Sequence, residues 1–212
     1  MIYKILNKQV NIEKDTLKGT AYEQTGIDHP YLYEFVYNKL REFGKEDIFI
    51  DAGANIGLFS LLIEKGKVIA FEPIPETFVK LLSNCSRNKD KKIMCVNNAL
   101  YSCEIPFEIE YYPITGCNRI HPSTKGEFTI TLDKWCKDNL KENENIRMIK
   151  IDTEGCDYNV LIGAEEVINK YHPVILIEVN KSPKEEIRTF LESKGYKINE
   201  EYTQDWIAEY ET

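Results

Sequence analysis

A glycine-rich loop and an acid downstream of it carry the clearest chemical signal in the chain. Residues 51–57 read DAGANIG and follow a short apolar run, so they lie where a strand ends. The glycines permit a tight turn and a close approach of the backbone to a ligand. A helix is expected over 55–65, and its start would offer unpaired N–H groups. Glu72 follows Gly53 by nineteen residues, at the end of the next apolar run, where an acid can bind the two hydroxyls of a ribose.

The pattern of this loop favours S-adenosylmethionine over a dinucleotide. Nicotinamide sites use GxGxxG, whereas this chain has GxNxG preceded by Asp51. A carboxylate is a poor neighbour for a pyrophosphate but a good one for the ammonium of an amino acid. S-adenosylmethionine has an amino-acid end, a ribose and no phosphate, and therefore fits better. A tight turn that binds no ligand is the structural alternative, and a nicotinamide-dependent oxidoreductase is a more distant one.

Several sequence blocks together resemble the FkbM-type family of S-adenosylmethionine-dependent methyltransferases. They are DAGANIGLFSLL, VIAFEPIPETF, NNALYS, TLDKW, IKIDTEGCDYNVLIGAEEVI and PVILIEV, in the family's order between about residues 47 and 180. The resemblance implies an α/β class I methyltransferase (Rossmann-like) fold, with a seven-stranded, mostly parallel sheet and an antiparallel C-terminal hairpin. It also implies O-methylation, often of sugar hydroxyls in glycans, polysaccharides or natural products.

Carried over by position, the resemblance implies a set of cofactor contacts. The family's cofactor loop falls on Asp51, Gly53, Asn55 and Gly57, and its ribose acid falls on Glu72. Pro73 would border the adenine. Asn98 and Ala99 follow the third strand, where such folds place adenine contacts. The chain departs from the family after its KIDxEG block, because Cys156-Asp157 stands where the family commonly has an apolar residue followed by an acid.

A second polar cluster follows two later apolar runs. Asp152 and Glu154 come after the run 148–151, and Glu178 and Asn180 lie at the end of the run 173–179. Ligands of open α/β sheets bind outside such strand ends, so Asp152, Glu154 and Glu178 are expected to face the reaction. Asp152 or Glu154 can act as general base toward a hydroxyl. The less favoured hypothesis is a Mg²⁺ ion held by Asp152, Glu178 and Asn180, and helix capping or lysine pairing is the structural alternative.

Alternating apolar and amphipathic segments predict the elements that position these residues. Strands are expected at 47–51, 67–71, 93–96, 148–151 and 173–179, helices at 32–43, from Pro75, at 158–170 and from Pro183 to Gly195, and a terminal hairpin at 196–200 and 205–210. Such alternation predicts a parallel sheet that is covered on both faces. Residues 107–140 have a different texture, which predicts a β insertion with a mobile loop at 113–126 and a short helix at 132–140.

Composition restricts the class of protein. The chain has 212 residues, 42% of them hydrophobic, which predicts one domain over 1–212 with a helical cap at 1–46. No apolar run approaches the roughly 20 residues of a membrane span, and the N-terminus lacks a signal-peptide pattern. A net charge of −8 argues against a general nucleic-acid binder. Six widely spaced cysteines favour reduced thiols in a cytoplasmic protein over disulfides or zinc.

The histidines and some aromatic residues are weaker candidates. His29 can fold over the cofactor or act as a base, but a surface or cap role is more common. His121 lies in the insertion, where an acceptor pocket would form, and His172 is interpreted as structural. Tyr111, Tyr112 and Trp135 can stack on a sugar ring or pack in the core.

The sequence thus predicts an O-methyltransferase that uses S-adenosylmethionine and acts on a sugar hydroxyl. The insertion at 107–126 and the N-terminal segment are expected to close over a glycan or small-molecule acceptor, and no appended domain is expected after the hairpin. Two alternatives stay open. One is a methyltransferase acting on oxygen or nitrogen of another small molecule or a protein, and the other is a binding module without turnover.

Overall fold

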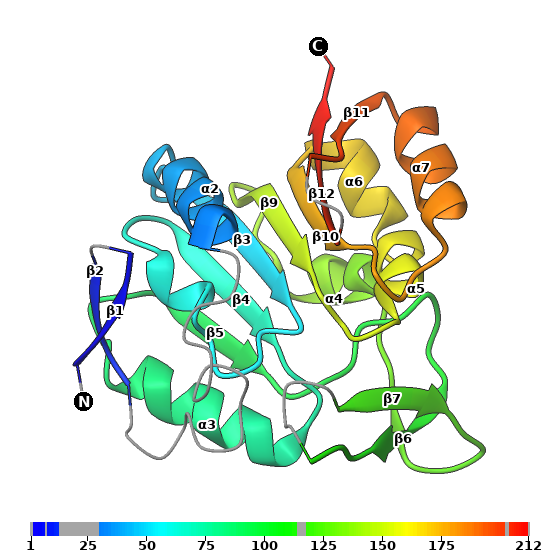
Figure 1. Cartoon of the computed structure of the whole chain (residues 1–212), viewed down its shortest axis with the longest axis horizontal. Coiled ribbons are helices and arrows are strands. Elements are labelled where there is room, and N and C mark those ends of the chain that lie inside the picture. The colour runs from blue at the N-terminus through cyan, green and yellow to red at the C-terminus, as the bar shows by residue number, and fades with distance from the viewer. Residues whose placement is uncertain (1, 7, 13–29, 114–117, 202–203, 212) are drawn as a thin grey trace.

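A seven-stranded sheet forms the centre of the protein in a computed structural model that describes residues 2–6, 8–12, 30–113, 118–201 and 204–211 (Figure 1). Its strands are β3 (Asp47–Ala52), β4 (Lys67–Phe71), β5 (Ile93–Val96), β9 (Asn145–Ile151), β10 (Val174–Glu178), β11 (Tyr196–Asn199) and β12 (Asp205–Tyr210). The order is β11-β12-β10-β9-β3-β4-β5. The strands from β10 to β5 pair in parallel, while β12 pairs antiparallel with both β10 and β11. The expected α/β class I fold is confirmed.

Helices cover both faces of the sheet, as its continuous apolar strands require. They are α2 (Pro30–Arg41), α3 (Pro75–Ser86), α4 (Leu132–Asn139), α5 (Asp157–Ile162), α6 (Glu165–Tyr171) and α7 (Lys184–Ser193). One buried cluster joins α4 to α7 with strand residues such as Ile50 and Ile149. The other joins α2 and Leu81 of α3 with Phe49 and Met148. Among the described helices, none has the length and apolar character needed to span a bilayer.

One face of the sheet changes from apolar to charged at its carboxyl end. Side chains two residues apart on a strand share a face, and the α2-covered face is apolar at Phe49, Ala70, Met148 and Leu176. Two or four residues further along the same strands, just at or past their ends, stand Asp51, Glu72, Lys150, Asp152 and Glu178. The register sets Asp51 directly opposite Lys150 on the neighbouring strand. The fold therefore gathers charged side chains from four strands at one edge.

The expected helix over 55–65 is wrong. Only a short 3₁₀ turn, η2 (Ser60–Leu62), forms there. Asn55 and Gly57 have φ angles of 51° and 90°, which lie outside the right-handed helical region and interrupt any helix that starts at the loop. The expected helix over 158–170 is likewise divided, because α5 ends at Ile162 and α6 begins only at Glu165.

The insertion between β5 and β9 carries a small sheet of its own. Its strands are β6 (Pro106–Glu110), β7 (Arg119–Pro122) and β8 (Glu127–Phe128), in the order β7-β6-β8. The loop expected at 113–126 therefore contains a strand, and residues 114–117 lie outside the described part of the chain. Figure 1 shows β6 and β7 beyond the carboxyl ends of β3 and β9, on the side of the charged edge.

Residues 1–46, expected as a helical cap, hold α2 and also a two-stranded antiparallel sheet. Its strands are β1 (Ile2–Ile5) and β2 (Lys8–Asn11). The side chain of Asn88, just after α3, accepts a hydrogen bond from the Asn11 N–H at 3.0 Å and donates one to the Asn11 carbonyl at 2.8 Å. His29 lies outside the described residues.

A substitution at Gly163, directly after α5, tests how tightly the segment after β5 packs against this helix. A Cβ at this position would lie 2.1 Å from the carbonyl oxygen of Tyr101. Overpacking of this kind costs about 1–3 kcal/mol, so Gly163→Ala is expected to lower the melting temperature by about 2–12 °C in calorimetry. Gly44→Ala is the matched control, because its Cβ would only reach ordinary contact at 3.5 Å from Asp47 Oδ2. Equal melting temperatures for the two variants would contradict this packing.

Candidate active site

A cavity of about 280 Å³ lies at the charged edge of the sheet, near the lower end of the range for ligand pockets. Its walls come from the β3 loop, the ends of β4, β9 and β10, the segment after β5, and the insertion. Of the residues expected from sequence it is lined by Gly53, Asn55, Glu72, Pro73, Asn98, Ala99, Asp152, Glu154 and Glu178. The expected cofactor and reaction groups thus share one cavity. Asp51, Gly57 and Asn180 are not in its lining.

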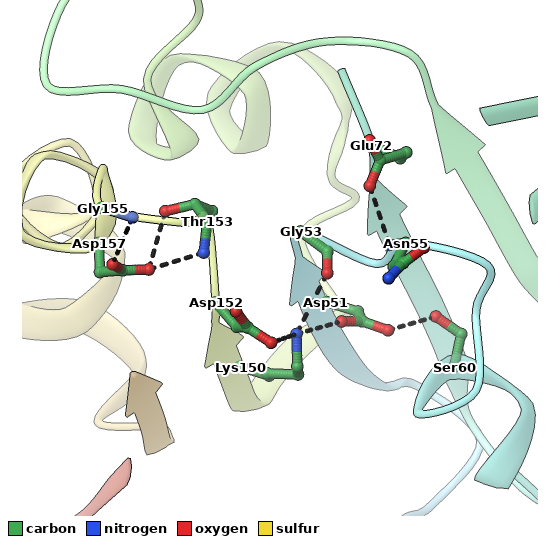
Figure 2. A network of polar contacts seen from close by, with 10 residues as sticks. All are labelled: Asp51, Gly53, Asn55, Ser60, Glu72, Lys150, Asp152, Thr153, Gly155 and Asp157. Carbon is green, nitrogen blue, oxygen red and sulfur yellow. Dashed lines mark hydrogen bonds and ion pairs between the residues drawn. The ribbon is translucent and has the colours of Figure 1, made fainter. Parts of the chain in front are cut away.

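Glu72 is held rigidly in the wall of this cavity. Its Oε2 accepts a hydrogen bond from the Asn55 N–H at 2.9 Å (Figure 2), and its Oε1 accepts one from the Ile74 N–H at 3.0 Å. Burial raises the pKa of Glu72 to about 7, although the two backbone hydrogen bonds and Lys150 oppose that shift. Each carboxylate oxygen has room for a second hydrogen bond. Glu72 can therefore accept hydrogen bonds from two hydroxyl groups at fixed positions.

Three backbone N–H groups of the glycine-rich loop already donate hydrogen bonds, and the N–H of Asn55, where a helix start with unpaired donors was expected, is one of them. Gly53 and Ala54 both donate to the Phe71 carbonyl, and Asn55 donates to Glu72. Gly53, with φ of 75°, is required because a Cβ would lie 1.8 Å from the carbonyl oxygen of Asp152. At Gly57 a Cβ would lie 2.6 Å from Leu81 Cδ1. Gly57 thus serves packing against α3.

Asp51 lies beneath the cavity and is fully buried, and its Oδ1 has no hydrogen-bond partner among the described residues. Its Oδ2 accepts a hydrogen bond from Ser60 Oγ at 2.6 Å, and its Oδ1 lies 3.5 Å from Lys150 Nζ. Lys150 itself lines the cavity and also lies 3.3 Å from Asp152 Oδ2 (Figure 2). The expected contact between Asp51 and an ammonium of the ligand stays a prediction, and the ammonium beside Asp51 in the structure is that of Lys150.

Lys150 was missed by the sequence reasoning, although a signal was present. It stands within Met148-Ile149-Lys150-Ile151, an apolar run that was expected to be buried on both faces. A charge in such a run needs a partner, because burial of an unpaired ion is costly. Its register opposite Asp51 could not be read from spacing alone.

Glu178 and Glu154 form the other wall and differ in their surroundings. Glu154 is ion-paired with Lys181, and burial raises its pKa. Burial raises the pKa of Glu178 to about 8, with further contributions from Asp152, Asp157 and Glu154. The Oε2 of Glu178 is buried and has no hydrogen-bond partner among the described residues. The pKa of the Glu178 carboxyl group is therefore close to neutral pH.

Asp157, another residue not expected from sequence, shapes the loop after β9. Its carboxylate accepts hydrogen bonds from the Thr153 N–H at 2.7 Å, Thr153 Oγ1 at 2.9 Å and the Gly155 N–H at 3.2 Å (Figure 2). Ser182 Oγ donates a further bond at 2.8 Å. Burial raises the pKa of Asp157 against these bonds. The loop that carries Asp152 and Glu154 is thus fixed from below by one buried acid.

The remaining candidates lie elsewhere. His121 pairs with Glu110 at 2.7 Å on an exposed part of the insertion, and His172 stacks on Tyr210 with ring centroids 3.8 Å apart. Trp135 is buried with its ring edge-on to Phe71, as expected for a core residue. Tyr111 and Tyr112 are exposed. Within the described ranges no group of three or more His, Cys, Asp or Glu is arranged to hold a metal ion.

The polar atoms of the cavity suit an adenosine group. Asn55 Oδ1, Thr77 Oγ1 and Asn98 Oδ1 are buried and have no hydrogen-bond partner in the described part of the chain. All three residues line the cavity. Buried polar groups normally have partners, and ribose hydroxyls and an adenine amino group are donors of the kind that the two amide oxygens need.

Comparisons with known proteins agree with this geometry. The hexuronic acid methyltransferase AglP of Haloferax volcanii is 29% identical over 160 residues, covering 73% of this chain and 66% of AglP. The chain thus spans just under two thirds of that relative. The methyltransferase FkbM structure from Methylobacillus flagellatus KT gives a TM-score of 0.56 at 17% identity, over 80% of this chain and 44% of that one. A Streptococcus mutans protein in complex with SAH (S-adenosylhomocysteine) gives 0.50 at 13% identity, over 86% and 97%.

At these identities the two structures show a shared fold and no more. The family model is more direct, because the methyltransferase FkbM domain matches residues 51–198. That match begins at Asp51, the first residue of the glycine-rich loop, includes the ends of β4, β9 and β10, and extends into β11. Since it covers well over half of the chain, the protein belongs to the FkbM methyltransferase family.

Proposed function

We propose that the protein transfers the methyl group of S-adenosylmethionine to a hydroxyl of a sugar. One observation carries the proposal. A single cavity joins Glu72, whose carboxylate is held by two backbone N–H groups and would accept hydrogen bonds from ribose hydroxyls, to Glu178, a carboxyl group with a buried oxygen that lacks a partner among the described residues. Family membership supports methyl transfer. The hexuronic acid methyltransferase relative supports a sugar acceptor.

The part of the cavity that is lined by the glycine-rich loop and Glu72, which we call the cofactor half, would bind and orient the cofactor. When bound, S-adenosylmethionine supplies an electrophilic methyl group on its sulfonium sulfur. Glu72 would accept hydrogen bonds from the ribose hydroxyls, and Asn98, Ala99 and Pro73 would surround the adenine. Gly53 and Asn55 would border the amino-acid end. Such positioning accounts for much of the rate of a displacement that needs three atoms in line.

The part of the cavity that is lined by Asp152, Glu154 and Glu178, which we call the acceptor half, would hold the sugar. Glu178 is the residue there that is best placed to take its proton. Glu154 is engaged by Lys181 and Asp152 by Lys150, whereas Glu178 Oε2 has no hydrogen-bond partner within the described residues. A base works best when its pKa lies near the working pH, and the pKa of Glu178 is about 8. Its ionised form would take the hydroxyl proton as the bond between the oxygen and the methyl carbon forms and the bond between that carbon and sulfur breaks, with SAH as the leaving group. Asp152 and Glu154 would then accept hydrogen bonds from neighbouring hydroxyls of a sugar.

Glu72→Gln tests the cofactor half. The ionised carboxylate would accept hydrogen bonds from both ribose hydroxyls, and its pKa is about 7. The affinity of the wild-type protein for SAH is therefore expected to rise about tenfold from pH 6 to 8. The variant should bind at least about tenfold more weakly and lose this pH dependence. Isothermal titration calorimetry measures both. Glu76→Gln, an exposed acid four residues along the chain, is the control, and identical binding by the two variants would contradict the role of Glu72.

Glu178→Gln tests the acceptor half. With methyl glycosides as acceptor probes and isotope-labelled S-adenosylmethionine, the wild-type rate is expected to rise with pH and level off above about 8. The variant should be slower by about a hundredfold or more and should bind SAH normally. Glu185→Gln, an exposed acid in the first turn of α7, serves as control. A loss of rate at Asp152→Asn but not at Glu178→Gln would assign the base to Asp152. Transfer to amines or non-sugar alcohols alone would exclude the sugar acceptor.

A further inference from the structure

Lys150 is an unusual residue for its place in the fold. It stands near the end of β9, a central strand, and its side chain is 4% exposed. A buried ion pair is no more stable than well-packed apolar residues of similar volume and is often less so. The apolar neighbours Met148 and Leu176 on the same face show what stability alone would favour. The lysine therefore calls for an explanation beyond packing.

The contacts of the Lys150 ammonium join two parts of the cavity wall. It donates a hydrogen bond to the Gly53 carbonyl at 3.2 Å and pairs with Asp51 at 3.5 Å, so it holds the glycine-rich loop. It also pairs with Asp152 Oδ2 at 3.3 Å, on the acceptor side. The ring of Phe59, centred 5.3 Å from the ammonium, lies against it, and Phe59 is itself stacked on Tyr33 of α2 at 4.0 Å. The ammonium is thus confined by several elements.

We infer that Lys150 is a positioning residue for methyl transfer. Its ammonium fixes the spacing between the loop that binds the cofactor and the carboxylate of Asp152 that faces the acceptor. An in-line displacement depends on this spacing, since an error of about 1 Å can cost about a hundredfold in rate. The inference rests on the proposed function, because the two walls matter together only if methyl donor and acceptor meet between them.

Charge alone can be separated from positioning. Lys150, Asp51 and Asp152 together carry a formal charge of −1. Lys150→Met with Asp51→Asn removes one positive and one negative charge, and so keeps −1 while deleting the ammonium. Lys150→Met alone gives −2, which would attract the extra positive charge of S-adenosylmethionine relative to SAH. A purely electrostatic role therefore predicts tighter S-adenosylmethionine binding in the single variant, and a positioning role predicts weaker binding of both ligands.

The test measures S-adenosylmethionine and SAH affinities by calorimetry for wild type, Lys150→Arg, Lys150→Met and the double variant Lys150→Met/Asp51→Asn. We expect the double variant to bind both ligands about tenfold more weakly, to a similar extent, and Lys150→Arg to stay much closer to wild type. The matched control is Lys67→Met, which breaks a pair with Glu144 at 3.2 Å, at the start of β4 and away from the cavity. Wild-type affinities in the folded double variant would overturn the inference, as would tighter S-adenosylmethionine binding by Lys150→Met.

A second measurement uses the wild-type protein, so that it does not depend on the folding of a variant. In ¹⁵N-lysine-labelled protein, the buried Lys150 ammonium is expected to give a slowly exchanging NMR signal that shifts when SAH binds, while the Lys67 signal stays constant. An unchanged Lys150 signal at saturating SAH would overturn the inference and leave the proposed function intact. Failure of the wild-type protein to bind either ligand would overturn both.

Discussion

The close contact between the ends of β3 and β9 is the constraint on which the site depends. The Asp152 N–H donates to the Ala52 carbonyl at 3.1 Å, and the next residue along, Gly53, passes so near the Asp152 carbonyl that a Cβ would lie 1.8 Å from it. One strand end continues into the glycine-rich loop and the other into the loop that carries Asp152 and Glu154. Two segments about a hundred residues apart in sequence thereby form adjoining walls of one cavity (Figure 2).

The same sheet face serves stability and chemistry at its two ends. Its middle is apolar and contributes to a core with α2 and α3, and its carboxyl end carries four acids and a lysine. Placing carboxylates in this buried edge has a cost, which is visible in the raised pKa values of Glu72 and Glu178. The protein offsets part of the cost with backbone N–H groups at Glu72 and with an ammonium between Asp51 and Asp152.

Much of the fold could be predicted from the sequence, because apolar runs and acids at strand ends are local signals. The parallel strands, the terminal hairpin and the place of Glu72 after β4 follow from such signals. The glycines predicted a tight turn, but the positive φ angles at Asn55 and Gly57 that exclude a helix over 55–65 could not be read from the sequence. Asn55 donates to Glu72 and Gly57 lies against Leu81, and both partners are outside the loop. Strand β7 was hidden in a polar segment, and its pairing with β6 depends on the partner strand. The place of Lys150 depends on a register between distant strands.

The glycine-rich loop has a further consequence for selectivity in a cell. Adenosine is shared by many abundant nucleotides, most of which carry phosphate. In this loop the N–H groups of Gly53, Ala54 and Asn55 are already bonded to Phe71 and Glu72, and two carboxylates stand close by at Asp51 and Asp152. A phosphorylated competitor would find no backbone donors at these positions and would meet negative charge. These contacts would disfavour an adenosine whose tail places a phosphate beside the loop.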